Sequence, residues 1–144
     1  MYKHILMPTD GSKCSEEAIK QGLAFAKELD AQVTFLYAVE DPAYDIARAA
    51  PYRKPFHDYL TQEAEASLNK AKRLADELGV AATTRLVDHQ QPARAIHEAE
   101  KDYDLIVMGT HGRRGFNRFA FGSVAEGVLR RSEKPCLVIH SSSA

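Results

Sequence analysis

The sequence has few cysteines and almost no net charge, and each of these absences excludes a class of protein. Its two cysteines, Cys14 and Cys136, are far apart and have neither CxxC nor metal-ligand spacing, which suits a reducing compartment rather than a disulfide framework. The 19 Lys and Arg against 20 Asp and Glu give a net charge of −1. This balance argues against nucleic-acid or anionic-membrane binding through overall charge, so we expect no nucleic-acid partner.

Long apolar runs are also missing. Stretches such as Leu105 to Met108 are far below the ~18 residues that indicate a membrane-spanning helix, so no membrane insertion is expected. The amino-terminal residues run into Pro8-Thr9-Asp10-Gly11 too soon to leave the apolar core of ~7–15 residues that a signal peptide needs. The expected location is therefore the cytoplasm.

What remains is a chain suited to one domain over residues 1–144. It has 144 residues, of which 44% are hydrophobic and 27% are charged. A chain of this size buries roughly 68–70% of its unfolded surface on folding. Its core therefore needs neither a disulfide nor a metal, and the function must lie on this domain.

Short apolar runs alternate with amphipathic segments along the chain. Strands are predicted over residues 5–7, 32–39, 80–87, 105–108 and 135–139, because these runs are rich in apolar and β-branched residues. Helices are predicted from a cap at Ser12 or Ser15 to Leu29, then over 57–78 with Gly79 ending the pattern, from Pro92 to Ala99, and over 123–131. The prolines in 41–56 predict an irregular connection with a short helical turn near Ile46.

This alternation of strands and helices predicts an α/β domain with a parallel sheet and helices on both faces. In such sheets ligands bind beyond the carboxyl ends of the strands, at the switch point in strand order. The segments 8–12, 39–41 and 109–123 are therefore the ones to examine for chemistry.

The segment 109–123 is rich in glycine, follows an apolar strand and opens the last predicted helix. Such a loop can direct backbone N–H groups at phosphates, and Gly122 and Ser123 add the amides and dipole of a helix N-terminus. The only charged residues from 105 to 125 are Arg113, Arg114 and Arg118, which favours an anion. The alternative is a surface loop that the arginines merely keep solvated.

Two common nucleotide motifs are absent from this loop. There is no GxxxxGK[ST], because no lysine follows Gly122, and no GxGxxG, because the spacing is Gly-x-x-Gly-x-x-Gly. Neither a P-loop NTPase nor a dinucleotide-dependent dehydrogenase is supported.

The spacing instead resembles the nucleotide-binding branch of the universal stress protein family. That signature is Gly, two residues, Gly, nine residues, Gly, then Ser or Thr, and Gly109, Gly112, Gly122 and Ser123 match it, with residues 113–121 between. Residues 8–12, Pro-Thr-Asp-Gly-Ser, are similar to the family's amino-terminal element. The resemblance covers essentially the whole chain.

The resemblance implies an open five-stranded parallel sheet of order 3-2-1-4-5, Rossmann-like, that binds ATP and forms a homodimer through its last strand, here residues 136–140. It implies that Asp10 contacts the ribose, that the backbone around Val39 reads the adenine edge, and that the glycine signature holds the phosphates. The candidate nucleotide-binding residues are Pro8, Thr9, Asp10, Val39, Met108, Gly109, His111, Gly112, Arg113, Gly122, Ser123 and Val124.

Several alternatives stay open for these residues. Asp10 can be a turn residue that satisfies nearby amides, and His111 can lie near a phosphate or its metal or have no chemical role. The ligand is ATP, with ADP or AMP as alternatives, and Mg²⁺ would be carried by the nucleotide because no acidic residue lies within the loop. The six histidines show no HExxH or equivalent pairing, so no zinc site is expected.

Catalytic patterns are weak, so the leading hypothesis is a nucleotide-dependent regulator of the stress response, read by a protein partner. No GxSxG surrounds any serine, and efficient phosphoryl transfer needs a positioned base and a charge clamp, so slow ATP hydrolysis is the most we expect. The alternatives are an enzyme that uses the same crevice, a hydrolase or nucleotidyl transferase, and a dimeric interaction module without a ligand.

Overall fold

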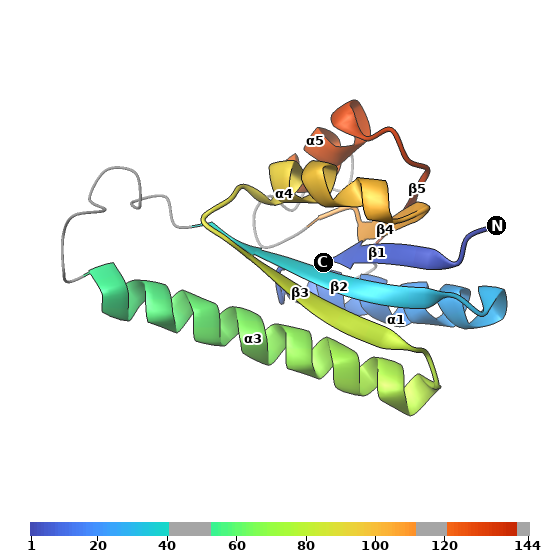
Figure 1. Ribbon diagram of the computed structural model, residues 1–144, viewed down its shortest axis with the longest axis horizontal. Coiled ribbons are helices and arrows are strands. Elements are labelled where there is room, and N and C mark those ends of the chain that lie inside the picture. Colours follow the sequence, from blue (N-terminus) through green and yellow to red (C-terminus); the bar gives the residue numbers. More distant parts are fainter. Residues whose placement is uncertain (41–52, 112–120, 141–144) are drawn as a thin grey trace.

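The computed structural model describes residues 1–40, 53–111 and 121–140. Strands and helices alternate along these residues (Figure 1). The elements are β1 (His4–Pro8), α1 (Lys13–Leu29), β2 (Gln32–Val39), α3 (Arg53–Leu78), β3 (Ala82–Asp88), α4 (Pro92–Ala99), the 3₁₀ helix η1 (Glu100–Asp102), β4 (Leu105–Gly109), α5 (Ser123–Arg131) and β5 (Cys136–Ile139).

The strands form one five-stranded sheet in the order β3-β2-β1-β4-β5. Each strand pairs in parallel with its neighbour, and β1 lies at the centre between β2 and β4. Leu6 of β1, for example, is in register with Thr34 on one side and Ile106 on the other. The predicted fold class and strand order are confirmed.

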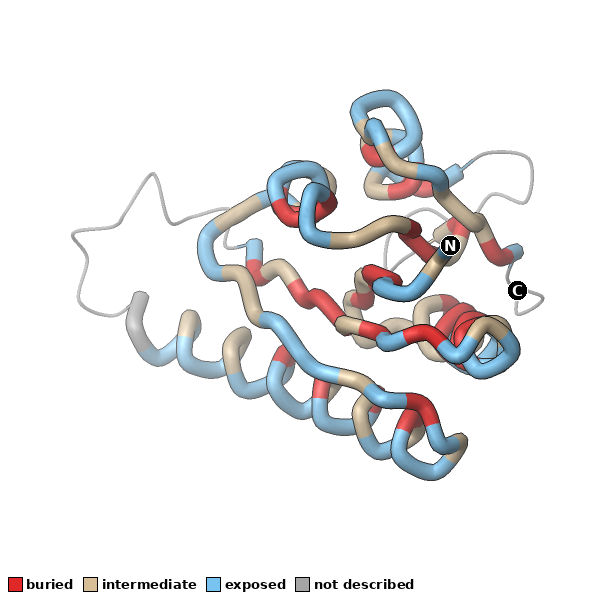
Figure 2. The backbone as a smooth tube through the Cα atoms, turned by 45° about the vertical axis from the view of Figure 1, so that its right-hand side comes forward, coloured by how far each residue is buried: buried red, intermediate tan, exposed pale blue. Residues whose placement is uncertain are grey.

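Helices cover both faces of the sheet, α1 and α3 on one face and α4 and α5 on the other (Figure 1). Successive side chains of a strand point to opposite faces, so Ile5 and Met7 pack with α1 and α3 while Leu6 packs with α4 and α5. Buried residues accordingly follow the strands and the inner sides of the helices (Figure 2). This two-sided burial explains why β4 is an uninterrupted apolar run.

The helix boundaries follow local signals. Ser12 is the N-cap of α1, where its hydroxyl accepts the Ser15 amide at 3.2 Å. Gly79 follows α3 with φ +75°, a conformation that glycine adopts without a Cβ penalty. Pro92 is the first residue of α4, as expected. One boundary was wrong: α3 starts at Arg53, not at residue 57, because proline is tolerated in a first helical turn. The turn expected near Ile46 lies outside the described residues.

A carboxylate fixes the start of β1 beside β4. Asp104 accepts the backbone amide of Lys3 at 3.0 Å and that of His4 at 3.1 Å, although Lys3 and Asp104 are 101 residues apart in sequence. The contact sets the register of the two strands whose carboxyl ends line the site described below.

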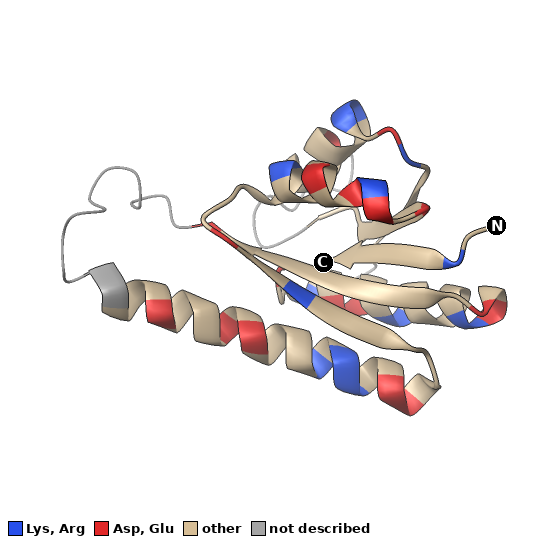
Figure 3. Cartoon of the chain, viewed as in Figure 1, with Lys and Arg blue, Asp and Glu red and all other residues tan. Residues whose placement is uncertain are grey.

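Charged residues of both signs lie on the helices, and few lie on the strands (Figure 3). Among the described residues, no helix has both the length and the apolar character needed to cross a bilayer.

Candidate functional site

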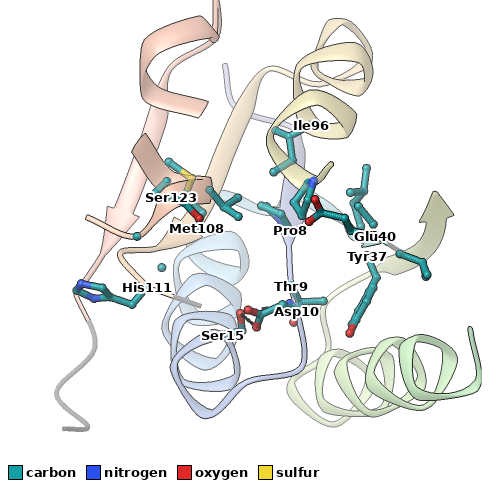
Figure 4. Close-up of a pocket in the computed structure, with 18 of the residues that line it drawn as sticks. Pro8, Thr9, Asp10, Ser15, Tyr37, Glu40, Ile96, Met108, His111 and Ser123 are labelled. Atoms are coloured by element: carbon teal, nitrogen blue, oxygen red, sulfur yellow. Dashed lines mark hydrogen bonds between the residues drawn. The ribbon is translucent and has the colours of Figure 1, made fainter. Parts of the chain in front are cut away.

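A pocket of about 490 Å³ lies beyond the carboxyl ends of β1, β2 and β4, at the switch point of the sheet. Its volume is in the range of small-molecule sites. Figure 4 shows Met108, His111 and Ser123 on one side, Tyr37 and Glu40 on the other, and Thr9 and Asp10 between them. Of the predicted residues, those that line it are Pro8, Thr9, Asp10, Val39, Met108, Gly109, His111, Gly122, Ser123 and Val124.

The other two predicted residues, Gly112 and Arg113, lie outside the described residues. The pocket is acidic in the part of its lining that the structure describes: Asp10, Glu40 and Glu63 line it, and no lysine or arginine does. Among the described lining residues, the positive potential that would attract an anion therefore has to come from backbone amides and helix dipoles.

Asp10 sits in a tight turn between β1 and α1. Its Oδ1 accepts the Ser12 amide at 2.9 Å and the Ser15 hydroxyl at 2.9 Å, and Gly11 follows with φ +78°. Both readings of Asp10 thus describe the same geometry: the carboxylate satisfies nearby amides, as a turn aspartate does, and the turn holds it at the pocket wall. This arrangement preorganises an acceptor for hydroxyl groups.

The N-terminus of α5 opens onto the opposite wall. Gly122 is its N-cap and has no side chain with which to cap the first turn. Ser123, Val124 and Ala125 are the first residues of the helix, and all three line the pocket. The first amides of a helix have no partner within the helix and carry the positive end of its dipole. This wall is therefore suited to an anion.

The glycines of the loop motif have different tasks. The Gly122 amide donates to the Thr110 carbonyl at 2.6 Å, so it closes the loop rather than pointing at a ligand. At Gly109 a Cβ would lie 3.2 Å from the Cβ of Ala18 on α1, so this glycine lets β4 approach that helix. The family resemblance implies that both glycines contact the phosphates; in the structure they bring the end of β4 and the start of α5 together.

The end of β2 forms the third wall. The Val39 carbonyl accepts the Gln90 amide at 3.3 Å, so its polar groups face β3. Neighbouring residues of a strand direct their backbone groups to opposite sides, so those of Ala38 and Glu40 face β1, which ends at Pro8. Backbone donors and acceptors near Val39 therefore border the pocket beyond the end of β1.

His111 and Thr110 sit where β4 leaves the sheet. The Thr110 hydroxyl and His111 Nδ1 are 3.0 Å apart, and Thr110 is buried while His111 is half-buried. The hydrogen bond orients the imidazole at the pocket lining. His111 therefore has an ordered place near the α5 wall.

Sequence reasoning missed one whole wall of the pocket. It is formed by α3 through Phe56, Tyr59, Leu60 and Glu63. The other lining residues that were not predicted are Ser15, Leu36, Tyr37, Ala38, Glu40, Pro92, Ile96, Thr110 and Ala125. Nothing in the spacing of α3 marks these positions as ligand-facing. Ser15 alone had a signal, because a hydroxyl five residues after Asp10 can reach it across a helix start.

Comparison with known proteins agrees with this geometry. A model of the universal stress protein family matches residues 1–140. Universal stress protein MJ0531 of Methanocaldococcus jannaschii is 38% identical over 140 residues, which cover 96% of this chain and 82% of that protein. The solved structure of MJ0577, from the same organism, has a TM-score of 0.83 at 29% identity and covers 100% of this chain and 99% of its own.

A third relative is a solved universal stress protein described as a complex with cAMP. It has a TM-score of 0.75 at 25% identity, covering 98% of this chain and 99% of its own. The family match and the likeness of the relatives both extend over almost the full length of the chain. This chain therefore belongs to the universal stress protein family.

Proposed function

We propose that this protein binds an adenine nucleotide, ATP, in the pocket at the switch point, and acts as a nucleotide-dependent regulator in the stress response. The observation that carries the proposal is that the uncapped N-terminus of α5 and the carboxylate of Asp10 line the same pocket. The first suits phosphates and the second suits ribose hydroxyls. The relative described in complex with cAMP supports an adenine nucleotide.

In this proposal the phosphates lie at Ser123 and Val124, where backbone amides and the helix dipole compensate their charge. Gly112 completes the phosphate contacts that the family resemblance implies, and the charge of Arg113 makes it a further candidate contact. ADP and AMP would use the same wall with fewer phosphate contacts. The nucleotide carries Mg²⁺, which keeps several waters and takes oxygen ligands from the phosphates.

The base lies toward β2 and α3. Apolar side chains from Ile96 and Leu60 line this part of the pocket, and backbone groups next to Val39 offer the donors and acceptors that an adenine edge needs. Asp10, held by Ser12 and Ser15, accepts the ribose hydroxyls midway between the base and the phosphates.

Catalysis is not the proposed role. Efficient phosphoryl transfer needs a base and a charge clamp placed at the γ-phosphate, and His111, which lines the pocket, is already paired with the Thr110 hydroxyl. We propose at most slow hydrolysis, so that occupancy, rather than turnover, is what a protein partner reads.

We also propose a homodimer through β5. This strand is at the edge of the sheet, with β4 as its neighbour, and edge strands are templates for pairing with a second chain. A single-domain, cytoplasmic protein is consistent with the two unpaired cysteines.

The test is a calorimetric titration of nucleotide-stripped protein with ATP and Mg²⁺, beside protein that was never stripped, and then with ADP, AMP and cAMP. Saturable binding at about one nucleotide per chain supports the proposal. Absence of binding by all four would overturn it and leave a ligand-free interaction module. Sedimentation of both samples measures the oligomeric state. A monomer at all concentrations would overturn the homodimer proposal and leave the nucleotide proposal untouched.

A further inference from the structure

A second cluster of ligand-type side chains lies outside the pocket, where the start of α3 meets the end of β3. His57 is on α3, Asp88 is the last residue of β3, and His89 follows it. One potential ligand atom from each of the three lies within 4.8 Å of the other two. Figure 1 shows the start of α3 and the end of β3 at the same end of the molecule. The fold thus brings two imidazoles and a carboxylate together.

We propose that the His57–Asp88–His89 cluster is a site for a divalent transition-metal ion, with Zn²⁺ as the reference ion. Imidazole and carboxylate ligands suit zinc and its neighbours. Three protein ligands leave a fourth position for water or another donor. The sequence shows no metal-ligand spacing here because His57 is 31 residues from Asp88. The packing of α3 on β3 brings the two side chains together.

The distances fit such an ion. His57 Nε2 is 3.1 Å from Asp88 Oδ2, and His89 Nε2 is 3.5 Å from the same oxygen. Bonds of 2.0–2.1 Å to a tetrahedral zinc place neighbouring ligand atoms about 3.3–3.4 Å apart. Both observed separations from the Asp88 oxygen are close to this value, and the three ligand atoms all lie within 4.8 Å of one another.

The His57 side chain places its Nε2 atom next to Asp88. Its side chain is 20% exposed, and its Nδ1 is buried with no hydrogen-bond partner among the described residues. The atom that faces the cluster is Nε2, which lies 3.1 Å from Asp88 Oδ2. A metal ion would bind Nε2 and would leave the surroundings of Nδ1 unchanged.

His89 is held so that it faces the same carboxylate. It adopts φ +53°, in the left-handed region, where histidine, asparagine and aspartate are more common than other non-glycine residues. Its ring stacks on that of His57, with centroids 4.3 Å apart and planes 18° apart. Both Nε2 atoms lie within 3.5 Å of an Asp88 carboxylate oxygen, and the two rings have to turn out of the stack for one ion to lie in the plane of both.

This site differs in chemistry and place from the proposed nucleotide pocket, because none of its three residues lines that pocket. Magnesium, the ion that accompanies nucleotides, prefers oxygen ligands and octahedral geometry and should not compete. The two sites share α3, whose Tyr59 and Leu60 line the pocket. A bound ion would link the start of α3, which forms one wall of the pocket, to the end of β3.

The test uses untagged, full-length protein, stripped of nucleotide and treated with a chelator that is then removed. Calorimetry with Zn²⁺ should give one ion per chain, while Mg²⁺ should give no binding at this site. His57→Gln and His89→Gln should each weaken Zn²⁺ by more than the roughly 10–100-fold that losing an outer-shell partner costs. The control is His97→Gln, because His97 is also near a carboxylate, 3.4 Å from Glu100, and should bind as the wild type does.

A second measurement needs no variant and so stands if the glutamine variants fail to fold. Zn²⁺ added to the wild-type protein should shift the imidazole NMR signals of His57 and His89 and leave those of His97 in place. No Zn²⁺ binding by the wild-type protein, wild-type Zn²⁺ affinity in both glutamine variants, or NMR shifts at other histidines only would each overturn the proposal. Because nucleotide is absent throughout, these outcomes do not depend on ATP binding, which its own titration tests.

Discussion

The backbone amide of Gly122 donates a hydrogen bond of 2.6 Å to the carbonyl oxygen of Thr110. It joins the residue after β4 to the N-cap of α5, although eleven positions separate them in the sequence (111–121). The amide of Gly122 is thereby occupied, and the helix amides that face the pocket begin at Ser123. The position of this wall relative to β4 depends on that bond.

Gly122→Val should abolish ATP binding and leave the fold intact. The backbone of Gly122, at φ −67° and ψ 165°, is open to any residue, so a side chain is tolerated by the chain but fills the space in front of the α5 amides. We expect at least about a tenfold loss of affinity, equal to ~1.4 kcal/mol, with an unchanged circular-dichroism spectrum. Gly122→Ala should lose less. Wild-type affinity in the valine variant would show that the phosphates lie elsewhere.

Asp10→Asn should weaken ATP binding through the ribose. The amide oxygen can still accept from Ser12 and Ser15, so the turn survives, but the charge and the second carboxylate oxygen are lost. Titrations with ATP and with 2′,3′-dideoxy-ATP separate the ribose contact from other effects. The variant should bind ATP more weakly than the wild type does and should bind the dideoxy analogue almost as well. Equal losses of affinity for both ligands would show that Asp10 does not contact the ribose hydroxyls. Ser15→Ala removes one hydrogen bond to the Asp10 carboxylate but keeps its charge. It should therefore weaken ATP binding less than Asp10→Asn does.

Gly109→Ala should destabilise the protein by about 1–3 kcal/mol, the usual cost of overpacking, because its Cβ would lie 3.2 Å from that of Ala18. Urea denaturation measures the loss. Ala18→Gly removes the opposing methyl at a cost of ~1 kcal/mol for a helix interior. In the double variant the two costs should be less than additive. Strict additivity would mean that the two residues do not press on each other.

Cys136 should alkylate slowly at neutral pH. Burial raises the pKa of the Cys136 thiol, with the Glu100 carboxylate adding to the rise and the Ser132 hydroxyl opposing it. A raised pKa lowers the thiolate fraction, and the thiolate is the reactive form, so the rate should rise only at a pH above the usual thiol range. Mass spectrometry of iodoacetamide adducts against pH measures it. Glu100→Gln should move the profile to lower pH, and buried Cys14 should stay unmodified while the protein is folded.

The element order could be predicted because each element carries its own pattern. The run from Gln32 to Val39 is rich in β-branched and aromatic residues and is a strand over those residues. Ser12 and Gly79 bound their helices through local chemistry, a hydroxyl cap and a positive φ. The strand order came from family resemblance, since alternation alone specifies parallel strands but not their neighbours.

The site was only partly predictable, because its walls meet through tertiary contacts. The turn at Asp10 and the start of α5 each have a motif, and both line the pocket. Tyr59 and Glu63 reach it only because α3 crosses the face of the sheet, which no local spacing encodes. Glycine spacing also could not separate a glycine needed for helix packing, Gly109, from one that closes a loop.

The central place of β1 has a consequence for how the chain folds over time. Its second neighbour, β4, is fixed to it by Asp104, 101 residues after Lys3, so a nascent chain completes most of its length before β1 is paired on both edges. Contacts this distant in sequence make folding slow, and an unpaired strand edge invites other chains. Between the synthesis of β1 and that of β4, the second edge of β1 is therefore open to pairing with other chains.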